Sequence, residues 1–194
     1  MKALTVVKGT IKTNPELAFV TKRDEYYLME VHTKRKSGTV DVVPVLFARK
    51  SIDPNADYVG MRINIKGDVQ SRRDDDKHLL LYVYAKEAEI YYAYDDTEEE
   101  DINEVQFKGT LKKSVFRKTP SDISIADVYL VHDRYFIPCI AWNNKAEEIV
   151  DVEKNTKIEI KARFQSRTYN KEINGVIEER IAYEISIYDL AIEF

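Results

Sequence analysis

The chain carries one long pattern twice. The first copy is "INIKGDVQSRRDDDKHLLLYVYAKEAEI", Ile63–Ile90, and the second is "IEIKARFQSRTYNKEINGVIEERIAYEISIYDLAI", Ile158–Ile192. Each copy reads I-x-I-K-x-x-x-Q-S-R, continues through a polar loop and ends in a run rich in β-forming residues. A pattern of this length, repeated in the same order, predicts two copies of one structural unit.

Two further landmarks keep the same order in both copies. "VKGTIK" (Val7–Lys12) matches "FKGTLK" (Phe107–Lys112), and "VVPVLFARK" (Val42–Lys50) matches "FIPCIAWNN" (Phe136–Asn144). With the Q-S-R triplet, the offsets between matching residues are 100, 94 and 95. Because only loop lengths change between the landmarks, we interpret the chain as an internal duplication of about 90 residues.

The charge distribution places the boundary between the copies. Residues 1–92 hold 16 basic and 13 acidic side chains, and residues 105–194 hold 14 of each. Between them, residues 93–104 hold seven acids and no base, a composition typical of a solvated, extended segment. We therefore expect an N-terminal domain over 1–92, an acidic linker over 93–104 and a C-terminal domain over 105–194.

Strand-like runs recur at short spacing in the first copy. They are "ALTVVKGTIK" (3–12), "EYYLMEVHT" (25–33), "VDVVPVLFA" (40–48), "RINIKGDVQ" (62–70) and "LLLYVYAKEAEI" (79–90). Between the third and fourth runs lies "KSIDPNADYVG", whose counterpart "NNKAEEIVDVEKN" has helix-forming residues. This layout predicts an all-β protein of two tandem OB-folds, five-stranded Greek-key barrels with a short helix or loop between strands three and four.

Four segments carry a family resemblance: "FKGTLKKSVFRKTPSDISIADVYL", "RYFIPCIAW", "NNKAEEIVDVEKNTKIEIKARFQSRTY" and "RIAYEISIYDLAIEF". Taken in order, they resemble the bacterial single-stranded-DNA-binding protein family over nearly all of residues 105–194. Residues 1–92 share the resemblance mainly through the repeat. The chain departs from the family in "TPSDISIADV", which lacks a usual Gly and Phe, and at Ala162, where Gly is common.

The third strand of the second copy carries rings on one face. One face holds Phe136, Pro138, Ile140 and Trp142, and the other holds Ile137, Cys139 and Ala141. One face must fill the barrel. The other face also carries apolar and aromatic side chains, so it needs a partner, and a nucleic-acid base is a suitable one. The resemblance implies that Phe136 and Trp142 fall at or near positions that stack on bases, although Trp142 in the core or at a dimer contact is the alternative.

The Q-S-R loops differ between the copies. In the second copy Arg167 can neutralise a phosphate, and Tyr169 offers a ring on which a base can stack. The first copy keeps Arg72 and Arg73 but continues with three aspartates and no ring. We therefore expect the second copy to bind nucleic acid more strongly than the first.

The first copy has one further candidate ring. Aligning its Pro44 with the proline of "RYFIPCIAW" places Ala48 opposite Trp142, with Phe47 one residue away. Either the register shifts by one and Phe47 stacks on a base, or this copy has lost its main ring.

Basic side chains supply the candidate phosphate contacts. The hairpin tip "HTKRKSGT" of the first copy flanks the expected groove and holds Lys34, Arg35 and Lys36. The other candidates lie on or near the first strand of each copy: Lys8, Lys12, Lys108, Lys112, Lys113, Arg117 and Lys118. Each contact to single-stranded DNA adds about 0.7 to the salt dependence of log K, whereas a lysine that only faces solvent adds nothing.

Cofactor and enzymatic chemistry find no support in the sequence. The single Cys139 excludes an internal disulfide, and the three histidines have no metal-ligand spacing. We find no phosphate-binding glycine loop and no nucleophile beside a histidine, so we expect a binding protein with no catalytic residues, metal or cofactor. No apolar run approaches membrane-spanning length, which favours a cytoplasmic protein.

Two classes of function remain after these exclusions. The first is binding of single-stranded DNA without strong sequence preference, which protects it during replication, recombination or repair, with a homodimer that presents four barrels. The second is an OB-fold adaptor that contacts replication or phage-recombination proteins and binds nucleic acid weakly or not at all. RNA in place of DNA stays open, because stacking and phosphate contacts serve both.

Overall fold

The computed structural model describes residues 3–74, 77–93, 99–173 and 175–193. The first copy forms β1 (Leu4–Ile11), β2 (Glu16–Val20), β3 (Glu25–Lys34), β4 (Val40–Ala48), a 3-10 turn (Arg49–Ser51), β5 (Arg62–Arg73) and β6 (Leu79–Tyr91). The second forms β7 (Ile102–Lys118), β8 (Ser124–His132), β9 (Tyr135–Trp142), α1 (Asn144–Val150), β10 (Lys157–Ile173) and β11 (Val176–Glu193). We call β1–β6 the N-terminal unit and β7–β11 the C-terminal unit.

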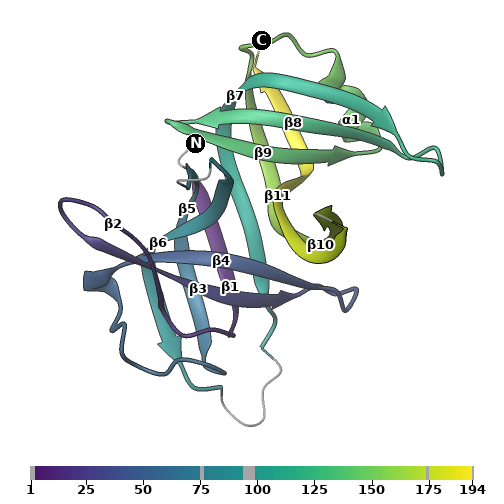
Figure 1. Ribbon diagram of the computed structural model, residues 1–194. Helices are drawn as coiled ribbons and strands as arrows, with labels where there is room; N and C mark the ends of the chain where they lie inside the picture. The colour runs from purple at the N-terminus through teal and green to yellow at the C-terminus, as the bar shows by residue number, and fades with distance from the viewer. Residues whose placement is uncertain (1–2, 75–76, 94–98, 174, 194) are drawn as a thin grey trace.

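The predicted pair of OB-folds is confirmed. In each unit a helical turn or helix follows the strand that carries the aligned proline, as expected (Figure 1). In α1 the apolar Ala146 and Ile149 are spaced to lie on one helix face, and both are buried. One strand was not predicted: the short β2 pairs antiparallel with β3 and carries Phe19.

Each barrel is filled by one face of its strands. Along β1 the burial alternates residue by residue, so Val7 and Ile11 are buried while Lys8 is partly exposed. In β9 the same alternation buries Ile137, Cys139 and Ala141, as the pattern predicted. The buried side chains of both units join in one hydrophobic cluster.

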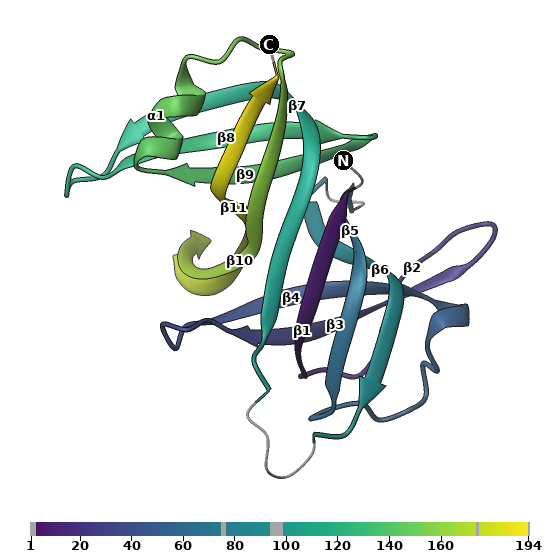
Figure 2. The ribbon, with the colours of Figure 1, turned by 180° about the vertical axis from the view of Figure 1, so that it is seen from behind.

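The two units pair through their first strands. In the described residues β1 and β7 lie antiparallel and join both barrels into one eleven-stranded sheet (Figure 2). Leu4 pairs with Gln106 and Val6 with Glu104, around a central pair of Thr5 and Val105. Since matching residues are 100 apart here, each unit presents the same segment to the other. The contact therefore has an approximate two-fold symmetry within one chain.

The repeated Q-S-R serine explains why the pattern occurs twice. The Ser71 hydroxyl donates to the carbonyl oxygen of Phe136 (2.8 Å), and the backbone N–H of Val42 donates to Ser166 Oγ (2.8 Å). Val42 and Phe136 are themselves matching residues of the repeat. Each serine thus ties its own unit to the equivalent strand of the other unit.

The acidic segment between the copies is only partly described, and residues 94–98 of the predicted linker lie outside the described residues. The part that follows is not simply solvated. Glu99 pairs with Lys8 (2.9 Å), and Asp101 pairs with Arg62 (2.7 Å). From Ile102 the chain is already in β7, because this stretch pairs with β1.

Candidate nucleic-acid interface

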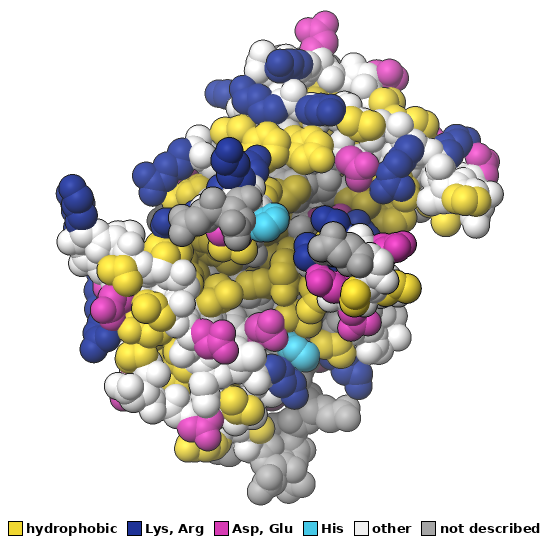
Figure 3. All heavy atoms as spheres, in the orientation of Figure 1, with side chains coloured by type: hydrophobic (Ala, Val, Ile, Leu, Met, Phe, Trp, Pro, Cys, Tyr) yellow, Lys and Arg dark blue, Asp and Glu magenta, His cyan; other side chains and the backbone are white. Residues whose placement is uncertain are grey.

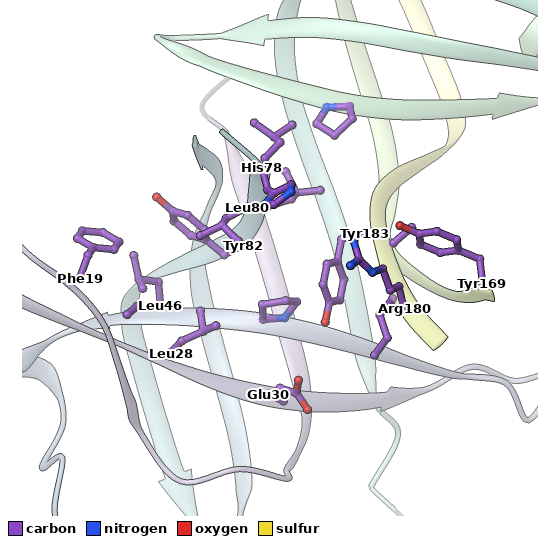
Figure 4. A pocket seen from close by; sticks show the side chains of 17 residues that line it. Phe19, Leu28, Glu30, Leu46, His78, Leu80, Tyr82, Tyr169, Arg180 and Tyr183 are labelled. Carbon is purple, nitrogen blue, oxygen red and sulfur yellow. The ribbon is translucent and has the colours of Figure 1, made fainter. Parts of the chain in front are cut away.

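A groove of about 670 Å³ lies between the two units, and we call it the central groove. The N-terminal unit lines the groove with the outer face of β3 and β4, through Leu28, Pro44 and Leu46. The C-terminal unit lines it with Ile181 and Tyr183 of β11. Figure 3 shows that hydrophobic side chains line the floor of this groove and that charged side chains surround it. In Figure 4 Phe19, Leu46 and Tyr82 gather at one end, with Tyr183, Arg180 and Tyr169 at the other.

The groove exists because the β10–β11 hairpin is long. Among the described residues β10 pairs with β7 over Lys157–Ala162, and β11 pairs with β9 over Ile185–Ile187. The rest of the hairpin projects beyond its own barrel and curls toward the N-terminal unit, as Figure 1 shows. Its distal part carries exposed apolar side chains, Ile177 among them.

The predicted stacking residues of the C-terminal unit lie at the surface. Phe136 is 37% exposed and stacks on Tyr129, with the ring centroids 5.2 Å apart. Trp142 is partly exposed at the end of β9, on the same face as Phe136. Tyr169 is 37% exposed, and the Arg167 guanidinium lies 5.7 Å from its ring centroid. These rings can therefore be reached by a base.

The prediction for Phe47 is wrong. Its side chain is fully buried in the core of the N-terminal unit, and Ala48 is buried as well. Phe47 lies on the face of β4 that fills the barrel, together with Val43 and Val45. No face of the Phe47 ring is open to a base, so we remove it from the candidate site.

The N-terminal unit has other aromatic rings, which the sequence did not lead us to predict as stacking residues. Phe19 of β2 stacks on Tyr26 of β3 at 4.8 Å, and Tyr26 lies 6.4 Å from Tyr84 of β6. Tyr82 shares the outer face of β6 with Tyr84. The alternation in "EYYLMEVHT" and "LLLYVYAKEAEI" is a signal that could have found them, by the reasoning that separated the faces of β9.

Many of the predicted phosphate contacts already have an anionic partner. Arg35 forms a two-pronged ion pair with buried Asp41, with Nε–Oδ2 at 2.6 Å. The other ion pairs join Lys8 to Glu99, Lys108 to Glu193, Arg117 to Asp127, Lys118 to Asp122 and Arg167 to Glu184. A phosphate that bound these cations would have to displace a carboxylate, so their contribution to binding is reduced.

Seven predicted cations have no carboxylate partner in the described part of the chain: Lys12, Lys34, Lys36, Lys112, Lys113, Arg72 and Arg73. Lys112 donates to the Asn155 side chain (2.9 Å), and Arg73 donates to the carbonyl of Lys77 (2.7 Å). Arg72 lies over the Phe19 ring, 4.0 Å from its centroid. The unpaired cations therefore belong mainly to the N-terminal unit.

Glu184 places a negative charge on the candidate face of the C-terminal unit. It lies on β11, accepts a hydrogen bond from Gln165 (3.2 Å) and pairs with Arg167 at 3.7 Å. Its carboxyl is largely buried, and this burial raises its pKa above the usual range, although Arg167 acts in the opposite direction. A buried carboxylate at this position opposes a phosphate backbone and destabilises the fold.

Glu184→Gln is expected to stabilise the protein at neutral pH and to raise its affinity for oligo-dT about threefold, because it removes one charge near the strand. Since the folded state raises the pKa, wild-type stability falls as pH rises from the carboxyl's usual range through the raised pKa, and the variant lacks this loss. Urea unfolding of both proteins at pH 4 and pH 8 measures the difference. An equal pH dependence would contradict the role given to Glu184.

Metal and membrane sites find no support in the described residues. No group of three or more His, Cys, Asp or Glu side chains there could hold a metal ion. Cys139 is buried in the barrel, and this burial raises the pKa of its thiol. Among the described residues no helix has the length and apolar composition needed to cross a membrane.

Fold and site together define a tandem OB-fold protein whose barrel faces carry exposed rings beside basic side chains. Solved structures of the single-stranded DNA binding protein from Thermus aquaticus share this architecture. The wild-type structure has a TM-score of 0.74 and 16% identity, and the similarity covers 100% of this chain and 93% of that chain. A deletion mutant has a TM-score of 0.71 and 17% identity, with 100% and 95% covered. The predicted resemblance is thus confirmed at the level of the fold.

Comparisons of the sequence alone give no further relative: no protein-family model and no curated protein matches this chain.

Proposed function

We propose that the protein binds single-stranded DNA without strong sequence preference. The observation that carries this proposal is the central groove, an apolar and aromatic surface that continues from the OB-fold face of one unit onto the hairpin of the other. Every base has a π-face and can pack on such a surface whatever its identity. A single strand could therefore contact both units at once.

In this mechanism rings hold bases while basic side chains hold the backbone. Trp142, Phe136 and Tyr169 are the candidate rings of the C-terminal unit, and each is at least partly exposed. Stacking contributes about 1–3 kcal/mol per base. The unpaired cations named above are the best candidates for phosphate contacts, and the ion-paired ones contribute less.

Trp142 is the only tryptophan, so its fluorescence reports on the C-terminal face. Titration with oligo-dT is expected to quench this fluorescence, because a base stacks on or near the indole. Binding should weaken with salt, with a slope in log K of about 0.7 for each phosphate contact. Titrations at several salt concentrations, with a mobility-shift assay on the same oligonucleotide, measure both effects.

The outcomes of that titration separate the possibilities. Binding without quenching would keep the proposed function and remove only Trp142 from the site. No quenching together with no mobility shift at low salt would contradict single-stranded DNA binding. Parallel titration with oligo-U decides whether RNA is an equal ligand.

The wider role extends from this activity. We propose that the protein acts in the cytoplasm as a binding protein that protects single-stranded DNA during replication, recombination or repair, alongside the proteins of those processes. Two barrels in one chain suggest a homodimer that presents four. A solution mass near that of one chain would contradict the dimer.

The C-terminal face favours a second candidate function. Arg117 and Arg167 are both paired with acids on this face, Asp127 and Glu184. Such pairing reduces the attraction for phosphate and suits an adaptor that binds a protein on the same face. Absence of any oligonucleotide binding would make this adaptor the leading function.

A further inference from the structure

A second cavity, of about 430 Å³, adjoins the central groove, and we call it the junction pocket. It shares Phe19, Leu46 and Tyr82 with the groove, so the two form one connected surface. The N-terminal unit supplies most of its lining. The C-terminal unit supplies Arg134, from the turn between β8 and β9, and Tyr135, the first residue of β9.

Aromatic rings line the pocket, and the ring of Phe19 is held between Tyr26 and the Arg72 guanidinium. Phe19 and Tyr26 are stacked, with ring planes 25° apart, and Tyr84 lies tilted beside Tyr26. Tyr135 closes the pocket from the opposite unit. A base that entered would meet rings from β3, β6 and β9.

Two guanidinium groups stand at the same pocket. Arg72 lies 4.0 Å over the Phe19 ring, and Arg134 lies 5.3 Å from the Tyr135 ring and donates to its hydroxyl (3.1 Å). No carboxylate in the described part of the chain is within ion-pair distance of either. Both therefore keep their charge for a phosphate, unlike Arg117 and Arg167 of the C-terminal unit.

The hydroxyl of Tyr82 is available to a ligand in the pocket. Its side chain is 6% exposed and lines both cavities, yet its hydroxyl has no hydrogen-bond partner among the described residues. Burial raises the pKa of Tyr82 to about 12, so the group is a neutral hydroxyl at physiological pH. The described buried side-chain atoms without a hydrogen-bond partner are Arg62 Nε and Arg163 Nε. The Tyr82 hydroxyl is therefore accessible from the cavities and can hydrogen-bond to a polar base edge.

The pocket depends on both units being in place. The Ser71 hydroxyl donates to the carbonyl of Phe136, and this bond holds β9 against the end of β5. Phe136 directly follows Tyr135, so the contact also positions the turn that carries Arg134. Neither unit alone would bring Arg72 and Arg134 to one cavity.

We propose that the junction pocket binds one nucleotide of the single strand, with its base against the rings of Tyr26, Tyr84 and Tyr135 and its phosphate between Arg72 and Arg134. This inference rests on the proposed function and deepens it. It assigns the strongest single contact to a site shared by the two units. Tyr82 contributes a hydrogen bond to the base.

The test compares Arg72→Ala, Arg134→Ala and their double variant with Arg49→Ala as the matched control. Arg49 is also exposed, but it pairs with Glu25 and lines neither cavity. Fluorescence anisotropy of labelled oligo-dT measures affinity at several salt concentrations. Each pocket variant is expected to weaken binding about tenfold and to reduce the salt slope by about 0.7. The control should change affinity about twofold or less, because its charge is already paired. Arg72 and Arg134 are exposed, so the variants should fold, and urea unfolding checks that they do.

A second measurement locates the base. An oligonucleotide with one photoreactive 5-iodouracil is expected to crosslink to peptides that contain Tyr26, Tyr84 or Tyr135. If the wild type binds oligo-dT and the double variant binds it with the same affinity, the pocket is overturned and DNA binding stands. Crosslinks confined to other peptides would have the same meaning. No oligonucleotide binding by the wild type would overturn both.

Discussion

Arg35→Ala is expected to lower the free energy of unfolding by about 3 kcal/mol, the usual consequence of removing one partner of a buried ion pair. The carboxylate of Asp41 is fully buried and receives both the Nε and Nη2 groups of Arg35. It also accepts the backbone N–H of Ser166 (3.3 Å), so the pair supports the contact between the units. Without Arg35 a buried charge remains uncompensated.

Neighbouring variants separate this structural role from phosphate binding. Lys36→Ala removes an exposed charge from the same hairpin and should leave urea unfolding within about 0.5 kcal/mol of wild type. Asp41→Asn in the Arg35→Ala background should restore part of the lost stability, because it removes the unpaired charge. If Arg35→Ala unfolded like wild type and only weakened oligo-dT binding, Arg35 would be a phosphate contact after all.

Gly67→Ala is expected to destabilise the protein by about 3 kcal/mol, at the upper end of the cost of overpacking. A Cβ at this position would stand 2.1 Å from the carbonyl oxygen of Tyr84, a backbone atom that cannot move alone. Gly67 lies at the register shift between β5 and β6, where the two strands approach closely. Urea unfolding followed by circular dichroism measures the loss.

The repeat supplies the matched control for Gly67. Ala162 is the equivalent residue, 95 positions later, and it also lies at a register shift, between β10 and β11. It is fully buried with its Cβ in place, so the C-terminal unit accommodates the side chain. Ala162→Gly should cost only about 1 kcal/mol, through backbone entropy. Equal effects of the two variants would contradict a steric reason for Gly67.

The alternation along single strands was sufficient to predict the faces of β9. Ile137, Cys139 and Ala141 are core residues and Phe136 is exposed, as period-two reading requires. The same rule places Phe47 with Val43 and Val45 on the core face of β4, where the repeat matches it to Ala141. The stacking role given to Phe47 needed a shift of register by one residue, and the structure has no such shift.

The predicted cations show a limit of prediction from a single sequence. Arg35, Arg117 and Arg167 read as exposed positive charges in the sequence, yet each has an acidic partner in the structure. Arg134 was not predicted, because the repeat gives no reason to place it beside Arg72. Ion pairs between strands depend on register, which a single sequence does not specify.

The amino-acid sequence by itself determined the duplication, the all-β class, the two OB-folds and the faces of their strands, because these follow from local periodicity and from the match between the copies. Only the tertiary structure decided how the two units meet. The pairing of β1 with β7, the reach of the β10–β11 hairpin and the meeting of Arg72 with Arg134 all join residues far apart in the chain. Such contacts are set by three-dimensional packing, so the candidate binding surface emerges only when both units are folded together.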